Sequence, residues 1–247
     1  MELTASGRSP AVKLLAIETA TAQSAVALTL DRQVQATATR VDRTGHGSFL
    51  VPAIDFCLDQ SGWFPDDLDA IVVDIGPGLY TGIRVGIATA QGLSAALGIP
   101  VVTASSLDAQ ALAAHTGHRH IFSVVDVRRG ELAVATYRPV PGGVVRDSEA
   151  ELMHPDQLKD ALMSDPGNPL VVGDVPVLPD SVLRGQHRVK VGRPRYPAVR
   201  AVLEIGMSKL EKDNFASEAL TPLYLREPDV NLNWEKLKPE DPWSSDS

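Results

Sequence analysis

Residues 69–98 read DAIVVDIGPGLYTGIRVGIATAQGLSAALG. The apolar run 70–75 is short, rich in β-branched residues and followed by a Gly-Pro-Gly turn signal, so it predicts a buried strand. The next residues, 80–97, contain no proline and no acidic side chain, and Gly98 supplies a stop, so they predict a helix. We therefore expect a strand, a tight turn and a helix in direct succession.

The predicted helix carries a row of small residues at every fourth position. The row comprises Gly78, Gly82, Gly86, Ala90, Ser94 and Gly98. Residues four apart form one ridge of a helix, so a row without large side chains is a groove that another backbone can approach. Glycine inside a helix costs about 1 kcal/mol relative to alanine, so the row needs a compensating contact. Either the groove is filled inside the chain's own domain, or it receives a partner protein.

A second predicted helix begins at Ser48, a typical N-cap, and continues to about Gln60. Apolar residues surround most of its circumference: Phe49, Leu50, Val51, Ala53, Ile54, Phe56, Cys57 and Leu58. Two helices with more apolar surface than one core face requires favour a helix-to-helix docking surface. The residues expected to contact a partner are Phe49, Ile54, Gly82, Arg84, Gly86 and Ala90. Leucine at Gly82 and Gly86 is then expected to prevent pairing and to leave the chain folded.

One motif in this region resembles a known family. GPGLYTGIRVG at 76–86, with KLLAIETATAQSAVAL before it and GIPVVTASSLDAQAL after it, resembles the bacterial TsaB family, also called YeaZ. The likeness runs from about 14 to 113, resumes at 124–137 and returns at the C-terminal PLYLR. It implies an α/β actin-like ATPase fold (ASKHA, or ribonuclease H-like) in two lobes. It also implies that helices of the first lobe pair with a TsaD-type protein, which makes threonylcarbamoyladenosine on tRNA.

The resemblance also implies a division of the chain. We expect a flexible leader at 1–12 and an N-terminal lobe at 13–104, to which a helix at about 197–212 returns. A C-terminal lobe is expected at 105–196. Residues 226–247 are acidic and interrupted by prolines, a composition that predicts a disordered tail.

Two strand-turn-strand segments are candidate phosphate sites, because kinases of this fold bind phosphate at such turns. The candidates are Glu18 and Thr19 in the first turn, and Asp126, Arg128 and Gly130 in the second. The first turn has no glycine, so a hairpin whose own hydroxyls satisfy its backbone remains the alternative. Arginines in the second turn can bind an anion as forks, or they can pair with neighbouring acids. We expect no resident cofactor and at most weak ATP or ADP binding.

No metal site is expected. The resemblance places a TsaD-type His-x-x-x-His pair at Ser106 and Gln110, and a hydroxyl and a neutral amide are weak ligands for a transition metal. The histidines of HTGHRH at 115–120 have no cysteine or carboxylate among them, which favours a solvated turn. His46 is expected in a loop, and Cys57 as a small core residue.

Composition limits the possible functions. The net charge of −8 makes the chain a poor autonomous nucleic-acid binder, because affinity for phosphate backbones comes mostly from clustered lysine and arginine. No stretch reaches the roughly 18 apolar residues of a membrane span. The first residues do not have the pattern of a secretory signal, so we expect a cytoplasmic protein without membrane contact.

The sequence offers no catalytic arrangement of its own, and the family resemblance implies that the chain pairs with a TsaD-type enzyme. A TsaE-type ATPase and tRNA are expected in the same complex, and self-association through the same face is expected when the partner is absent. One alternative is an ATP-dependent small-molecule kinase of the same fold, which requires glycines in both phosphate turns and a catalytic aspartate. Another is an M22-type peptidase-like protein, for which the sequence offers no Ser/His/Asp or His-x-x-x-His arrangement.

Overall fold

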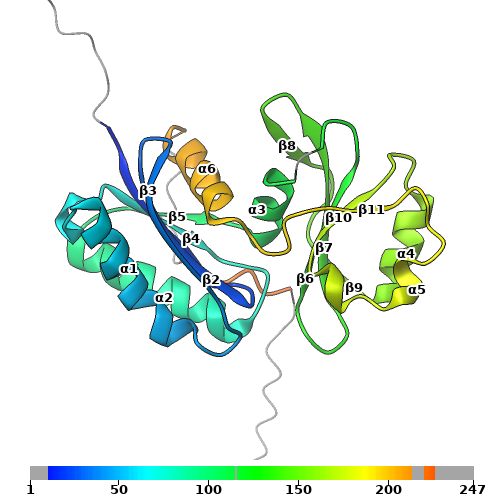
Figure 1. The fold of residues 1–247 in the computed structure, drawn as a ribbon, viewed down its shortest axis with the longest axis horizontal. Coiled ribbons are helices and arrows are strands. Elements are labelled where there is room, and N and C mark those ends of the chain that lie inside the picture. Colours follow the sequence, from blue (N-terminus) through cyan, green and yellow to red (C-terminus); the bar gives the residue numbers. More distant parts are fainter. Residues whose placement is uncertain (1–10, 115, 213–219, 226–247) are drawn as a thin grey trace, which may run out of the picture.

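The computed structural model describes residues 11–114, 116–212 and 220–225, which form two α/β lobes side by side (Figure 1). The predicted tail at 226–247 lies outside the described residues. Of the predicted leader only Ala11 and Val12 are described, and the Val12 amide donates to the Asp31 carboxylate at 3.0 Å.

The first lobe is built on a sheet with the order β3-β2-β1-β4-β5. Its strands are β1 (Lys13–Glu18), β2 (Gln23–Leu30), β3 (Gln33–Val41), β4 (Ala70–Asp74) and β5 (Val101–Ala104). The first three strands are an antiparallel meander, whereas β4 runs parallel to β1 and β5 runs parallel to β4. Because Ile17 lies opposite Val73, the residues that follow, Glu18 and Asp74, reach the same edge of the sheet.

The second lobe repeats this plan with the order β8-β7-β6-β10-β11. Its strands are β6 (Ile121–Asp126), β7 (Leu132–Val140), β8 (Gly143–Arg146), β10 (Leu170–Gly173) and β11 (Lys190–Val191), and β9 (Glu151–Met153) pairs with β7. A meander followed by two parallel strands therefore occurs in both lobes. The prediction of a two-lobed α/β fold of the actin-like type is confirmed.

Helices cover both faces of each sheet, as the long apolar strands require. The outer face of the first sheet carries α1 (His46–Ser61) and α2 (Tyr80–Leu97) (Figure 1). Between the two sheets lie α3 (Ser106–Leu112) and α6 (Val199–Leu210). The far side of the second sheet carries α4 (Pro155–Ser164) and α5 (Asp180–Leu183), and η1 (Pro65–Asp67) and η2 (Val175–Val177) are short 3-10 turns.

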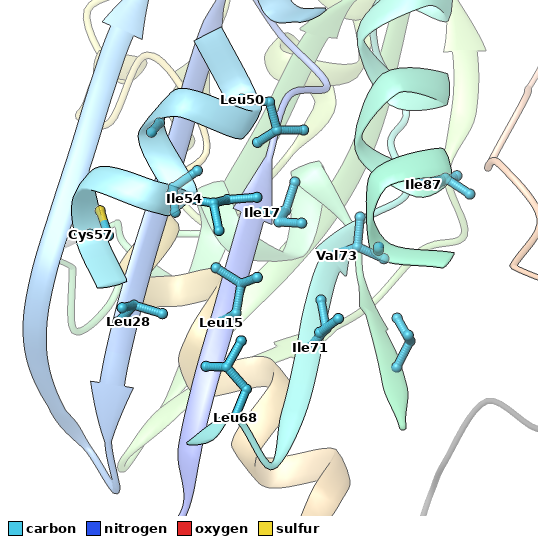
Figure 2. Packing of buried hydrophobic residues seen from close by; sticks show 14 of the residues in the cluster. Leu15, Ile17, Leu28, Leu50, Ile54, Cys57, Leu68, Ile71, Val73 and Ile87 are labelled. Carbon is cyan, nitrogen blue, oxygen red and sulfur yellow. The ribbon is translucent and has the colours of Figure 1, made fainter. Parts of the chain in front are cut away.

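The core between the first sheet and its outer helices follows the alternation of side chains along a strand. Leu15 and Ile17 of β1 point toward α1 and α2, where they meet Leu50 and Ile54 (Figure 2). Leu14 and the other alternate residues of β1 face α6 on the opposite side. Cys57 is fully buried in the outer core, as predicted.

Two local details complete the fold. The helix α1 begins at His46, before the expected start, so Ser48 lies in its first turn and donates to the carbonyl of Gly45 at 3.1 Å. The helix ends at Ser61, close to the expected end, and Gly62 caps it with a left-handed φ of 65°. Among the helices of the described ranges, none is both long and apolar enough to cross a membrane.

Candidate functional site

The first half of the small-residue row, Gly78, Gly82 and Gly86, is filled by the chain's own first turn. The Thr19 hydroxyl donates to the carbonyl of Gly82 at 2.8 Å, and the amide of Leu79 donates to the carbonyl of Ala20 at 2.6 Å. A Cβ at Gly82 would lie closer than 3.0 Å to the Thr19 carbonyl oxygen, and a Cβ at Gly86 equally close to the Thr19 hydroxyl. The groove therefore accommodates the end of β1, and the prediction that it receives a partner was wrong.

Most of the residues expected to contact a partner are accordingly inaccessible. Gly82 and Gly86 are buried, Ala90 is fully buried and Ile54 is only 6% exposed. These four residues belong to the core for the same reason: they lie on the faces of α1 and α2 that meet the first sheet. Leucine at Gly82 or Gly86 would disrupt the fold itself, which corrects the expectation that the chain would stay folded.

The outer face of α1 and α2 is different, because large apolar side chains reach the surface there. Val51 is 62% exposed, Phe56 is 52% exposed and Tyr80 is 46% exposed, while Phe49 is half-buried against the core. We call Val51, Phe56 and Tyr80 the outer apolar face. Large exposed apolar residues on adjacent helices are typical of a protein interaction surface.

Arg84 also lies on the outside of α2, where it is held by two tyrosines. Its Nε donates to the hydroxyl of Tyr224 at 2.9 Å, and its guanidinium lies 3.9 Å from the centre of the Tyr80 ring. The rings of Tyr80 and Tyr224 stack with centroids 5.2 Å apart. This cluster attaches residues 222–225 to α2. The Leu223 amide also donates to the carbonyl of Ile75, just after β4, at 2.8 Å.

Glu18, the first phosphate-turn candidate, is fully buried beside a second carboxyl group, Asp74. The Ala20 amide donates to Glu18 Oε1 at 2.9 Å, while Oε2 has no hydrogen-bond partner among the described residues. Asp74 accepts from the Gly76 amide at 2.8 Å and from the Ser106 hydroxyl at 2.9 and 2.8 Å. Thr19 is also buried and engaged with α2, so this turn is closed around its own polar groups.

The carboxyl groups of Glu18 and Asp74 both have a higher pKa than a carboxyl group in water. Burial raises the pKa of Glu18 well above its usual value, and the charge of Asp74 raises it further. Burial also raises the pKa of Asp74 to about 7, against the hydrogen bonds from Gly76 and Ser106. Asp74 was not predicted from the sequence. The sequence did contain a signal for Asp74. This residue lies at the C-terminal end of an apolar strand, and the functional polar groups of parallel α/β sheets lie at such strand ends.

A small pocket lies in the cleft between the lobes. Its lining includes Thr21, Arg43 and Leu79 from the first lobe and Asp126 and Asp174 from the second, and its volume is about 10 Å³. That volume holds about one water molecule. This one pocket is smaller than a nucleotide, and its two aspartates would repel phosphates.

The second predicted turn lies at the edge of this cleft. The Arg128 amide donates to the Asp126 carboxylate at 2.8 Å, and Arg128, Arg129 and Gly130 all have positive φ, at 74°, 58° and 75°. Such a conformation is unfavourable for arginine. The Asp126 carboxylate therefore binds the backbone of its own turn.

The positions of the expected histidine pair make internal contacts. Ser106 binds Asp74, and Gln110 accepts a hydrogen bond from the Ser123 hydroxyl at 2.8 Å. In the described part of the chain, no group of three or more His, Cys, Asp or Glu residues is arranged to hold a metal ion. Of the HTGHRH segment, His115 lies outside the described residues and His120 Nδ1 lies 2.9 Å from the Asp165 carboxylate.

His46 is in a helix and buried, not in a loop as expected. Its Nδ1 lies 2.7 Å from the Ser24 hydroxyl, and Nε2 has no hydrogen-bond partner among the described residues. Burial lowers the pKa of His46, so the imidazole is neutral in the fold at neutral pH. This contact could not be predicted locally, because Ser24 lies on β2, 22 residues away in the sequence.

Comparisons with known proteins found a matching family model and relatives that are similar along most of the chain. A family model described as TsaD, tRNA N6-adenosine threonylcarbamoyltransferase, matches residues 40–166. The tRNA threonylcarbamoyladenosine biosynthesis protein TsaB of Escherichia coli (strain K12) is 30% identical over 231 residues, which cover 92% of this chain and 98% of that protein. The protein of the same name from Bacillus subtilis (strain 168) is 35% identical over 127 residues, covering 51% of this chain and 55% of that protein.

A solved structure shows the same fold. YeaZ from Pseudomonas aeruginosa superimposes with a TM-score of 0.74 at 26% sequence identity, over 87% of this chain and all (100%) of that chain. The similarity therefore extends across both lobes.

Proposed function

Because the chain belongs to the TsaB family of tRNA threonylcarbamoyladenosine biosynthesis proteins, we propose that it acts in this pathway as a non-catalytic partner of a TsaD-type protein. The observation that carries the proposal is the outer apolar face, the exposed side chains of Val51 and Phe56 on α1 and of Tyr80 on α2. Water is a poor environment for such a surface, and a partner helix would cover it. The proposal includes a cytoplasmic location, because the pathway modifies tRNA.

The interior of the molecule supports an accessory role. The carboxyl groups of Glu18 and Asp74 are buried, and Ser106 and Gln110 are engaged within the chain. None of these groups is open to a substrate. The proposed contribution of the chain is a rigid helical face, and a specific complex of ordinary size would bury about 800 Å² of it.

The kinase alternative has less support. The pocket of about 10 Å³ in the interlobe cleft, lined in part by Asp126 and Asp174, is smaller than ATP, so we propose that the chain has no resident nucleotide. The peptidase-like alternative needs an activated nucleophile or a metal-bound water, and the described residues at the cleft supply neither arrangement.

Further partners belong to the same proposal. A TsaE-type ATPase and tRNA would join the complex of the chain with its TsaD-type protein. The outer apolar face would also support self-association when that protein is absent, because the same surface is then open to a second copy.

The test is co-purification with the TsaD-type protein. Val51→Glu combined with Phe56→Glu places two charges on the outer apolar face, and removal of one central interface residue can cost 2 kcal/mol or more. We expect at least a roughly thirtyfold weaker complex and a monomeric free chain in size-exclusion chromatography.

Met163→Glu is the matched control. Met163 is 61% exposed, but it lies on α4 of the other lobe, so the complex should form as in the wild type. Undiminished binding by the double variant would count against the docking face. Steady ATP turnover by the purified chain would count against a non-catalytic role.

A further inference from the structure

A strongly basic segment crosses from the second lobe to the first. Residues 184–200 hold six of the 23 lysines and arginines and no aspartate or glutamate, in a chain of net charge −8. These basic residues are Arg184, Arg188, Lys190, Arg193, Arg195 and Arg200, and all of them are exposed. The cluster is therefore a local feature that runs against the overall charge of the protein.

The ends of the segment are neutralised, and its centre is not. Arg184 lies 3.6 Å from Asp180, and Arg200 lies 3.5 Å from Glu204. Between these pairs, Lys190, Arg193 and Arg195 form no ion pair with a carboxylate of the described residues. Arg188, Lys190, Arg193 and Arg195 are called the basic strip below. Neighbouring charges of one sign repel each other, so an unpaired strip is typical of a surface that binds an anion.

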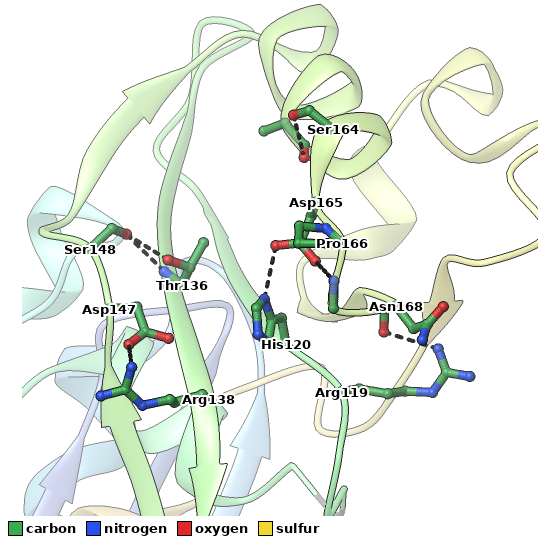
Figure 3. A network of polar contacts seen from close by, with 12 residues as sticks. Arg119, His120, Thr136, Arg138, Asp147, Ser148, Ser164, Asp165, Pro166 and Asn168 are labelled. Carbon is green, nitrogen blue, oxygen red and sulfur yellow. Dashed lines mark hydrogen bonds and ion pairs between the residues drawn. The ribbon is translucent and has the colours of Figure 1, made fainter.

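One end of the strip is fixed to the second lobe. Arg188 donates to the carbonyls of Asp165 and Pro166 at 3.2 and 3.0 Å. Arg119 donates to the carbonyls of Asn168 and Arg188, both at 3.0 Å, and Figure 3 shows Arg119 beside Asn168. Lys190 then enters β11, the last strand of the second sheet, and no other strand of the described residues pairs along this margin.

The other end of the strip is held against the end of β10. The Gly173 amide donates to the carbonyl of Pro194 at 3.0 Å, which holds the segment against the end of β10. Burial raises the pKa of Asp174 in the cleft, and the charges of Arg195 and Arg43 act in the opposite direction. Arg43, which lines the cleft from the first lobe, therefore continues the positive charge beyond the strip.

We infer that the basic strip binds the phosphate backbone of tRNA. Exposed lysine and arginine side chains on an ordered backbone are the groups that contact phosphates, and these contacts position a nucleic acid without reading its sequence. The inference rests on the proposed role in tRNA modification. The strip lies at the margin of the second sheet, whereas the docking helices α1 and α2 cover the outer face of the first, so both surfaces can be occupied together (Figure 1).

The experiment measures tRNA binding as a function of salt. Lys190→Gln, Arg193→Gln and Arg195→Gln are combined, and Arg188 is left unchanged because it holds the Asn168 loop. The control variant combines Arg32→Gln, Arg40→Gln and Arg138→Gln, which remove the same number of exposed positive charges elsewhere. A labelled tRNA transcript is titrated with the complex of each variant and the TsaD-type protein, and also with each chain alone.

Each phosphate contact contributes about 0.7 to 0.9 to the slope of log K against log salt, so the strip variant should lower the slope by roughly 2 to 3. The affinity at 0.1 M salt should fall on the order of a hundredfold. The control variant should stay within about threefold of the wild type. Thermal melting of both variants checks that they are folded.

The outcomes separate this inference from the proposed function. Equal affinity of the two triple variants for tRNA would overturn the inference, and so would a strip variant that loses the TsaD-type protein but keeps tRNA binding. A complex that forms and does not bind tRNA would overturn the inference alone. If no complex forms, strip-dependent binding of tRNA by the chain alone supports the inference and contradicts only the proposed pairing.

Discussion

Replacing Gly82 with alanine should destabilise the protein, although alanine is the better helix former by about 1 kcal/mol. The added Cβ would lie closer than 3.0 Å to the carbonyl oxygen of Thr19 and 3.3 Å from His46 Nε2. The carbonyl belongs to the backbone at the end of β1, so it cannot rotate away as a side chain would. Either α2 or the first turn has to move, and the hydrogen bond from the Thr19 hydroxyl to Gly82 is strained with it.

Gly92→Ala supplies the matched control in the same helix. Gly92 is exposed, and nothing lies within 4 Å of the position of its Cβ. Overpacking costs typically 1 to 3 kcal/mol, and the backbone contact at Gly82 places that substitution at the upper end, about 3 kcal/mol. Gly92→Ala should instead stabilise by about 1 kcal/mol, so the two changes are expected to have opposite signs.

Urea denaturation followed by circular dichroism measures both free energies of unfolding. In a chain of this size 1 kcal/mol corresponds to about 2 to 4 °C in Tm, so Gly82→Ala should melt roughly 6 to 12 °C lower and Gly92→Ala about 2 to 4 °C higher. A Gly82→Ala variant as stable as the wild type would refute the enclosed groove. If Gly82→Ala instead lost partner binding without losing stability, the groove would be a binding site for the partner.

Asp74→Asn should flatten the dependence of stability on pH. The pKa of Asp74 is raised to about 7 by burial, so its contribution to folding is fully present below about pH 4 and is lost as the pH rises toward 7, on the order of 3 to 4 kcal/mol. Relative to the wild type, the variant should gain stability at pH 8 compared with pH 4.5, and parallel unfolding profiles would contradict this reasoning. Burial also raises the pKa of the Cys57 thiol to about 11, so it should react with a thiol reagent at pH 8 only as fast as the protein opens, and rapid labelling of the folded chain would place Cys57 at the surface.

Several features could be predicted from local sequence alone. The short β-branched run at 70–74 and the proline-free stretch at 80–97 are a strand and a helix, since hydrophobic pattern and turn residues act within a few positions. The motif around the Gly-Pro-Gly turn also identified the family. Of the site, the replacement of the histidine pair by Ser106 and Gln110 was visible in the sequence.

The tertiary structure decided which backbone lies in the groove of α2. A row of small residues indicates that something approaches closely, but the pattern is the same whether that neighbour is Thr19 of the same chain or a residue of another protein. The pairing of Glu18 with Asp74 and the course of the basic strip across two lobes depend equally on residues far apart in sequence. The periodicity of a helix or strand indicates which of its faces is buried, but not which element covers that face. Only the packing of whole elements determines which surfaces remain open to a partner.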